Sequence, residues 1–203
     1  MSAARREWNH NIHYFAFIER VAAAKARRSA LDVGPGDGML AARLARSIPS
    51  VIGLDLDAHQ VELARAAHSS TPGLRFVNGD VLETTPEGAP FDLVVCSATI
   101  HHMPLAPALE RLAKLTAPGG SLVVVGLARD ESRRDLLQSL VSVVASRIAR
   151  ARRGWYDHGA PMLDPVDDWA RVRATALSTL PGAEYRRRLY WRYTLVWEKP
   201  VSA

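Results

Sequence analysis

The chain has 203 residues, of which 48% are apolar and 23% are charged, and its net charge at pH 7 is +5. This composition is typical of one soluble globular domain and excludes a fibrous or intrinsically disordered chain. No stretch approaches the roughly 20 apolar residues that cross a membrane, and a single cysteine, Cys96, excludes an internal disulfide and a cysteine-based zinc cluster. We therefore expect a cytoplasmic, single-domain protein without membrane contact.

The N-terminal region predicts a helix that precedes the first strand. Apolar residues recur at steps of three and four between Glu7 and Lys25, which is typical of an amphipathic helix. The next segment, ALDVGPGDGMLA from Ala30 to Ala41, has a short apolar run before three glycines and a helical apolar pattern after them. It predicts a strand, a tight turn and a second helix.

Gly34, Gly36 and Gly38 stand at alternate positions of this turn. Glycine permits a tight turn for conformational reasons alone, but the missing Cβ atoms also let backbone amides approach a ligand. The dinucleotide fingerprint has the spacing Gly-x-Gly-x-x-Gly and faces a pyrophosphate. The spacing here is Gly-x-Gly-x-Gly, with Asp32 in the preceding strand. Because a carboxylate repels phosphate and attracts a cation, we expect a ligand that carries an amine.

Three further apolar runs predict strands, and aspartates follow the first of them. The runs are Val51–Leu54, Leu74–Val77 and Phe91–Cys96. Asp55 lies about twenty residues beyond the glycine turn, a separation typical of the carboxylate that accepts hydrogen bonds from ribose hydroxyls. Asp57 is a rival, but it precedes a predicted helix that begins at Ala58, where an aspartate is explained as an N-cap.

The rest of the chain predicts three helices and three strands. In chain order they are the helix Ala106–Leu115, the strand Ser121–Gly126, the helices Glu131–Arg153 and Asp167–Leu180, and strands near Ala183–Arg188 and Leu189–Trp197. The longest helix carries apolar residues on one side, which we expect to wall a substrate pocket. The last two strands leave little room for a helix between them, so they are expected to be antiparallel.

The series LDVGPGDG, VIGLDLD, FVNGDVLE, FDLVVCSATIHHM and LTAPGGSLVVVG, in this order from Ala30 to Leu127, resembles the motifs of the class I S-adenosylmethionine-dependent methyltransferases. The resemblance covers about half of the chain. It implies an α/β fold, a Rossmann-like doubly wound seven-stranded sheet with an antiparallel last strand, and this reversed strand counts against a dehydrogenase. It also implies one methyltransferase domain, with a lid helix in residues 1–28, a cofactor-binding half in 29–127, and substrate-side helices and antiparallel strands in 128–203.

S-adenosyl-L-methionine is the cofactor that this resemblance implies. Asp80 is expected to receive the adenine amino group and the Val81 amide to reach a ring nitrogen, although an aspartate here also suits an ordinary turn. Cys96 and Ser97 border the methionine portion, because ligands gather beyond the carboxyl ends of the strands. Tyr14 contacts the cofactor or simply packs. The residues expected to bind the cofactor are Tyr14, Asp32, Gly34, Pro35, Gly36, Gly38, Asp55, Leu56, Gly79, Asp80, Val81, Cys96 and Ser97.

His101 is the candidate catalytic residue. Its loop follows the fourth strand and faces the space where an acceptor must lie, and an unperturbed imidazole pKa near 6.5 suits a general base. His102 is a weaker candidate, and both rings equally suit a role in shaping the pocket. The aromatic loop Gly154–Pro165 offers His158 as a second base, with packing as the alternative. Nothing in the sequence indicates a metal.

The expected activity is direct in-line methyl transfer to a small-molecule oxygen, nitrogen or carbon. Arginines gather in residues 147–153 and 186–188, but few aromatic residues lie between them, so a solvated face is favoured over a nucleic-acid site. A nucleic-acid methyltransferase, a cofactor-binding homologue without methyl transfer and a nicotinamide enzyme stay as alternatives. The sequence leaves open whether the protein is a monomer or a homodimer.

Overall fold

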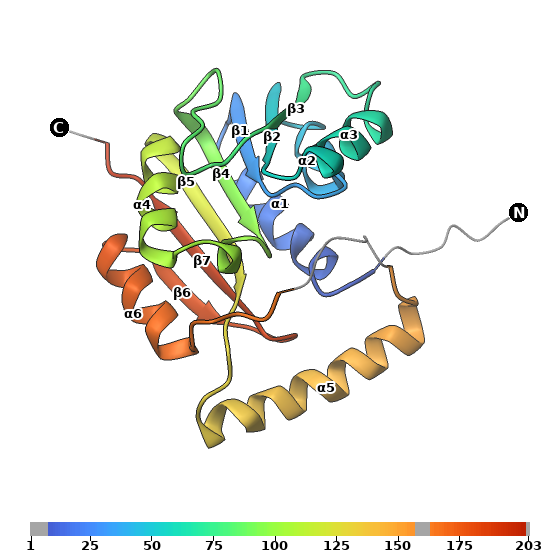
Figure 1. The fold of residues 1–203 in the computed structure, drawn as a ribbon, viewed down its shortest axis with the longest axis vertical. Helices are drawn as coiled ribbons and strands as arrows, with labels where there is room; N and C mark the ends of the chain where they lie inside the picture. Colours follow the sequence, from blue (N-terminus) through green and yellow to red (C-terminus); the bar gives the residue numbers. More distant parts are fainter. Residues whose placement is uncertain (1–7, 157–162, 202–203) are drawn as a thin grey trace, which may run out of the picture.

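The structure, a computed structural model, describes residues 8–156 and 163–201. Its centre is a seven-stranded sheet with helices on both faces (Figure 1). The strands are β1 (Ser29–Val33), β2 (Ser50–Asp55), β3 (Leu74–Asn78), β4 (Phe91–Ser97), β5 (Thr116–Leu127), β6 (Glu184–Arg187) and β7 (Arg192–Glu198). The helices are η1 (Ile12–Tyr14), α1 (Phe15–Ala23), α2 (Met39–Leu44), α3 (Ala58–Ala67), η2 (Ile100–His102), α4 (Leu105–Leu115), α5 (Arg133–Arg153) and α6 (Trp169–Thr179).

The strand order is β3-β2-β1-β4-β5-β7-β6. The five strands β1 to β5 all run parallel to one another. Strand β7 runs antiparallel to both β5 and β6. The order reverses between β1 and β4, and the crevice beyond their carboxyl ends is the usual ligand site of such sheets. The doubly wound sheet with an antiparallel last strand is therefore confirmed.

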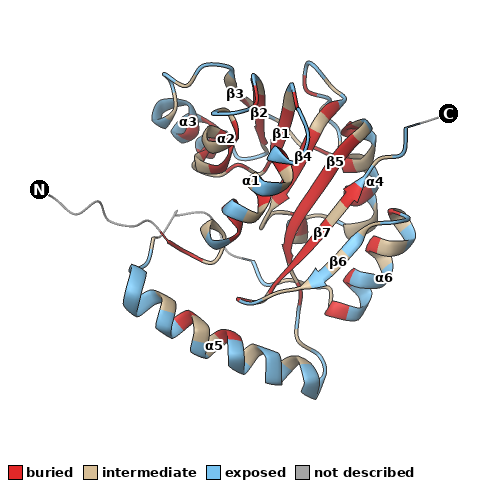
Figure 2. Cartoon of the chain, turned by 180° about the vertical axis from the view of Figure 1, so that it is seen from behind, coloured by how far each residue is buried: buried red, intermediate tan, exposed pale blue. Residues whose placement is uncertain are grey.

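Each face of the sheet has its own apolar layer. On β1, Leu31 and Val33 pack with the layer beneath α4 and α6, while Ala30 packs with the layer beneath α1, α2 and α3. This alternation follows from the period of two in a strand. Figure 2 shows the central strands buried along most of their length, as expected for parallel strands covered on both sides.

The N-terminal helix is shorter than the sequence predicts. The expected helix spans Glu7 to Lys25, but the first helical turn is η1 and α1 ends at Ala23. The Oδ1 atom of Asn9 accepts the backbone N–H groups of Asn11 at 2.9 Å and Ile12 at 2.8 Å, so its side chain caps this first turn. Glu7 lies outside the described residues.

The C-terminal hairpin also differs in its bounds. The alternation of aromatic and aliphatic residues predicts a strand from Leu189, but β7 begins at Arg192. Tyr190 and Trp191 have φ angles of 57° and 56° and form the turn instead. The Tyr190 ring is buried and stacks on His10, which compensates for this unfavourable backbone conformation.

The longest helix, α5, presents its apolar side to solvent. Ser132 and Asp135 form a capping box at its start, so α5 begins two residues later than the predicted Glu131. The expectation that its apolar side walls a substrate pocket is wrong, because all of its large aliphatic side chains except the half-buried Val143 are exposed. These are Leu136, Leu137, Leu140, Val141, Val144 and Ile148.

The close contact between β5 and β7 requires a residue without a Cβ atom at position 126, which Gly126 provides. This glycine pairs with Tyr193, and a Cβ atom added to it lies 2.2 Å from the Tyr193 ring. We expect Gly126→Ala to lower the free energy of unfolding by about 1–3 kcal/mol through overpacking, measured by urea denaturation. Because Tyr193→Leu removes the obstructing ring, the double variant should lose less than the sum of the two single losses. Additive losses contradict this steric explanation.

Candidate functional site

The glycine loop between β1 and α2 forms the floor of the site. Gly34, Gly36 and Gly38 all have positive φ angles, of 68°, 54° and 78°. The Gly34 N–H donates to the Leu54 carbonyl of β2 at 2.9 Å, and the Gly38 N–H donates to the Pro35 carbonyl at 3.0 Å. The first bond holds the loop against β2, and the second closes the turn within the loop.

The glycines differ in what surrounds them. A Cβ atom on Gly34 collides with the Thr99 side chain at 2.2 Å, so this glycine is required by packing within the protein. A Cβ atom on Gly36 meets nothing within 4 Å. Gly36 therefore borders open space, where a ligand can approach the backbone closely.

Asp32 is an ionisable group in an apolar strand. It is 1% exposed, and its Oδ2 atom has no hydrogen-bond partner among the described residues. Burial raises the pKa of Asp32 to about 7, and the negative charges of Asp55 and Asp37 add to this shift, while the Ala41 amide opposes it. A buried carboxylate with one oxygen that lacks a donor is costly, so this position favours a cation from outside the chain.

The tip of β2 lies beside the glycine loop. The Asp55 carboxylate accepts the Gly36 N–H at 3.4 Å and the Asp57 N–H at 3.0 Å. Asp57 itself accepts the His59 N–H at 2.8 Å and is the N-cap of α3, which confirms the structural explanation of that residue. Between them, the Leu56 side chain is 72% exposed.

The tip of β3 is joined to the tip of β2. The Gly79 N–H donates to the Asp55 carbonyl at 2.9 Å. Asp80 Oδ1 accepts the Leu82 N–H at 2.9 Å, so Asp80 forms the turn that was its alternative explanation, and the buried Val81 follows it. Asp55, which ends β2, and Asp80, two residues after the end of β3, thus both lie at the carboxyl edge of the sheet.

β4 ends at the same edge with Cys96 and Ser97. Cys96 is fully buried, and burial raises the pKa of its thiol, so it is unsuited to act as a nucleophile. The Ser97 Oγ atom is buried and lacks a hydrogen-bond partner in the described part of the chain. Ser97 and Asp32 therefore both leave a polar group for a ligand at the carboxyl ends of β1 and β4.

Tyr14 has a partner within the chain. Its hydroxyl donates to the Leu189 carbonyl at 2.7 Å, and its side chain is buried. His13 similarly packs its ring edge-on against Tyr190, with the centroids 4.8 Å apart. Both rings thus tie the N-terminal segment to the final hairpin, which agrees with the packing alternative for Tyr14.

A cavity of about 460 Å³ opens directly beyond β4. Residues 100–107, residues 165–167 and one side of α6 line it, with Leu127 and Tyr193 from the sheet. His101 lies in its wall with Nδ1 buried and unpartnered among the residues described. Burial lowers the pKa of His101 to about 4, and His102 and Arg192 contribute to the shift. The His101 ring is therefore neutral at pH 7.

The sequence did not identify a tyrosine that closes over the glycine loop. The Tyr156 hydroxyl donates to Asp37 Oδ2 at 2.9 Å, and the Tyr156 N–H donates to the Trp8 carbonyl at 2.9 Å. The aromatic content of the loop Gly154–Pro165 was the available signal, but nothing in it specified Asp37 as the partner. His158, the second base candidate, lies outside the described residues.

The match to known proteins extends over nearly the whole chain. The model of a methyltransferase domain family matches residues 30–120. An uncharacterized methyltransferase of Mycobacterium tuberculosis strain H37Rv is 39% identical over 196 residues, which are 96% of this chain and 98% of the relative. Trans-aconitate 2-methyltransferase of Deinococcus radiodurans is 34% identical, over 76% of this chain and 64% of the relative.

Solved structures agree in fold. The N-methyltransferase NodS of Bradyrhizobium japonicum, determined with S-adenosyl-L-homocysteine, aligns with a TM-score of 0.64 at 16% identity, over 93% of this chain and 87% of the other. The glycine loop, the carboxylates at the strand tips and the reversed last strand are the features on which the motif resemblance depended. The chain belongs to the class I S-adenosylmethionine-dependent methyltransferases.

Proposed function

We propose that the protein transfers the methyl group of S-adenosyl-L-methionine to a small molecule bound in the cavity beside His101. The observation that carries this proposal is the buried carboxylate of Asp32, whose Oδ2 atom lacks a partner among the described residues, at the same sheet edge as the open Gly36 and the cavity. A cofactor with an ammonium group supplies the cation that Asp32 lacks. Its sulfonium also supplies an electrophilic methyl group, so the chain needs no further electrophile.

The residues at the strand tips fit the remaining parts of the cofactor. Asp55 presents carboxylate oxygens for the ribose hydroxyls, and the exposed Leu56 beside it offers apolar surface for a base to cover. Asp80 and the Val81 amide offer an acceptor and a donor for the adenine edge. Gly36 borders open space and Ser97 offers an unpartnered hydroxyl, while Gly79 packs against Thr84 and joins the tips of β2 and β3, and Cys96 contributes packing behind them.

The chain's own contribution is mainly positioning. Holding donor and acceptor in line removes much of the entropy of encounter, and water is excluded by the apolar wall of the cavity. His101 is neutral at pH 7 and can accept a proton, but a pKa of about 4 makes it a weak base. We assign His101 the role of accepting a hydrogen bond from the methyl acceptor. It then takes up the proton of the methyl acceptor once the methyl group has been transferred.

Relatives support a small acceptor. The trans-aconitate 2-methyltransferase already described is one, and an enzyme of Paracidovorax citrulli named ubiquinone biosynthesis O-methyltransferase is 28% identical over 92% of this chain and 78% of its own length. The direct test is transfer of a labelled methyl group to a panel of phenols, amines and carboxylic acids, with RNA and DNA as separate arms. Binding of S-adenosylhomocysteine without transfer to any acceptor identifies a non-methylating homologue, and label in nucleic acid contradicts the small-molecule proposal.

Asp32→Asn should change stability and cofactor binding in opposite directions. The raised pKa means that the folded state holds a proton up to about pH 7 that the unfolded state loses near pH 4, so wild-type stability without cofactor falls as pH rises through this window. At pH 8 we expect the variant to raise the free energy of unfolding by about 1–3 kcal/mol. Its affinity for S-adenosylhomocysteine should fall by about 10- to 100-fold, because the charged partner is lost.

Denaturation with and without S-adenosylhomocysteine, together with calorimetric titration, measures both effects. The stability gain should disappear near pH 4, where Asp32 is protonated in the wild type as well. A variant that loses affinity and is also less stable than the wild type at pH 8 points to general damage and contradicts this role.

A pair of matched variants tests the ribose assignment. Asp55→Asn removes the charge beside the glycine loop, and we expect S-adenosylhomocysteine to bind about tenfold more weakly or worse. Asp57→Asn is the control, since asparagine caps a helix as well as aspartate does and should leave the affinity unchanged. Equal losses in the two variants argue against a specific role for Asp55.

His101→Gln should lower kcat for the acceptor found in the panel by about 100-fold, the lower end of what a positioned proton acceptor contributes. The affinity for S-adenosylhomocysteine should stay within about twofold of the wild type. His59→Gln, on the exposed side of α3, is the control and should behave as the wild type. Unchanged turnover in His101→Gln assigns this ring to the shape of the cavity alone.

A further inference from the structure

The helix α5 forms one end of the molecule. In both views it is the outermost element, with the rest of the chain on one side of it only (Figures 1 and 2). Its buried residues are Ser142 and Ser146, whereas its large aliphatic residues other than the half-buried Val143 are 49–64% exposed. The helix thus presents the reverse of the usual arrangement, in which the apolar side faces the core.

Polar contacts fix this orientation along the middle of the helix. The Tyr190 N–H donates to Ser142 Oγ at 3.1 Å, and Ser146 Oγ lies 2.8 Å from His10 Nε2. Both serines are on the side that faces the body, so rotation of α5 about its axis breaks these bonds. At the C-terminal end the Arg150 guanidinium lies 4.0 Å from the centre of the Trp155 ring.

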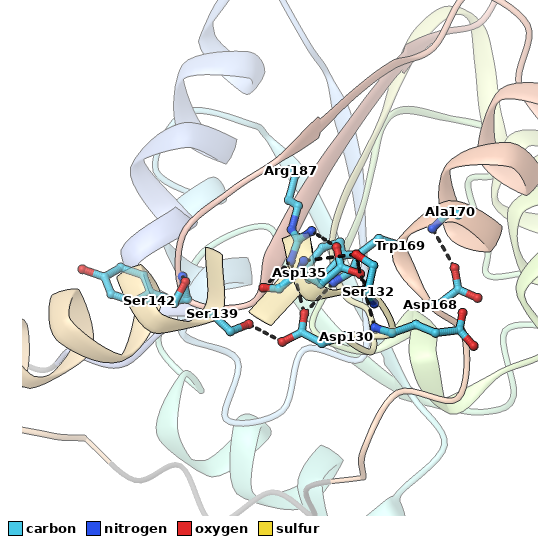
Figure 3. Close-up of polar contacts among 11 residues, drawn as sticks. Asp130, Ser132, Asp135, Ser139, Ser142, Asp168, Trp169, Ala170 and Arg187 are labelled. Atoms are coloured by element: carbon cyan, nitrogen blue, oxygen red, sulfur yellow. Dashed lines mark hydrogen bonds and ion pairs between the residues drawn. The ribbon is translucent and has the colours of Figure 1, made fainter. Parts of the chain in front are cut away.

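An ion pair between partly buried side chains holds the start of the helix (Figure 3). Arg187 of β6 pairs with Asp135 and, at 3.2 Å, with Asp130, and its guanidinium lies 3.9 Å from the centre of the Trp169 ring. Asp130 also accepts the Trp169 Nε1–H at 2.8 Å and the Ser139 hydroxyl. Contacts with the rest of the structure therefore fix the orientation in which α5 exposes its aliphatic side.

The exposed aliphatic residues form one continuous stripe. Four of them follow one another at steps of four, namely Leu136, Leu140, Val144 and Ile148. The side chains of Leu137 and Val141 lie beside this row. At a rise of about 1.5 Å per residue the stripe is roughly 18 Å long. It is a convex surface, and none of its residues lines the cavity beyond β4.

Arginines stand at both ends of this stripe. The helix contains six arginines and one acidic residue, Asp135, which is engaged by Arg187. Arg133 and Arg147 lie seven residues before and after Leu140 and so share its face. A second copy is a poor partner, because either orientation of two such helices brings arginines together. The positive charge of these arginines is instead complementary to a surface that carries anionic groups above an apolar interior.

We propose that α5 docks the protein on a membrane surface that carries anionic phospholipids. A helix with an aliphatic stripe and flanking arginines lies in the plane of such a surface, with its apolar side among the acyl chains and its cations at the headgroups. No helix in the described residues is long and apolar enough to cross a membrane. A helix that lies along the membrane surface does not have to span the bilayer, so this finding does not exclude it.

Co-sedimentation with vesicles tests the proposal independently of methyl transfer. We use vesicles of phosphatidylcholine alone and of phosphatidylcholine with phosphatidylglycerol in equal parts, at low and high salt. The protein should sediment with the anionic vesicles at low salt and stay in solution with the neutral ones. Absence of binding to the anionic vesicles overturns the proposal.

Two sets of variants locate the contact. Leu136→Ser, Leu140→Ser and Val144→Ser combined should weaken vesicle binding by about tenfold or more, because each CH₂ group removed from the lipid costs affinity. Leu63→Ser, on the exposed side of α3, is the control. Arg133→Gln with Arg147→Gln should weaken binding by about fivefold for each charge, whereas Arg46→Gln with Arg75→Gln should not.

Since the substituted side chains are exposed, the variants should unfold at the wild-type temperature, and this is checked first. Equal vesicle binding by the stripe variant and the Leu63→Ser control assigns the contact to another surface and overturns the proposal. Sedimentation velocity provides the remaining test. A wild-type dimer that the stripe substitutions convert to a monomer identifies a second copy as the occupant of α5, which also overturns it.

Discussion

A carboxylate kept away from water without a full set of donors is the constraint on which the site depends. Asp32 lies in β1 between β2 and β4, so parallel neighbours shield it on both sides. Because all parallel strands end at one edge of the sheet, the charges of Asp37 and Asp55 come close to it and oppose its ionisation. The same topology that buries Asp32 thus creates a local excess of negative charge. A ligand with a cationic end relieves both the desolvation and the repulsion.

The reversal of strand order separates a polar part of the proposed site from an apolar part. Strands β1, β2 and β3 end in the glycine loop and the aspartates, which suit a polar cofactor. Beyond β4 the wall becomes apolar and is shared with α4 and α6, which suits a small acceptor. His101 lies in the wall of this cavity, and burial lowers its pKa. Burial therefore limits His101 as a base in the proposed reaction.

Features encoded by neighbouring residues could be predicted from the sequence. The apolar runs predicted β2, β3 and β4 to within one residue, whereas β5 begins five residues before the predicted Ser121. The order of Asp57 and Ala58 was enough to identify an N-cap. Long-range contacts could not be predicted. The Tyr14 hydroxyl bonds to Leu189 and the Tyr156 hydroxyl to Asp37, across 175 and 119 residues of the chain. No local pattern specifies such a partner, since the tertiary fold alone brings the two groups together.

The same limit explains α5. Apolar periodicity predicted the helix correctly, but periodicity does not state which side faces the protein. The side that does so is the one with hydrogen-bonding partners, Ser142 and Ser146, held by Tyr190 and His10. Leaving one leucine exposed forgoes about 1.5–3 kcal/mol of hydrophobic stabilisation, and this helix leaves three leucines exposed. The parallel strands point toward the end of the molecule where α5 lies (Figure 1). A surface that covers the stripe therefore lies at the same end of the molecule as the proposed cofactor and acceptor sites.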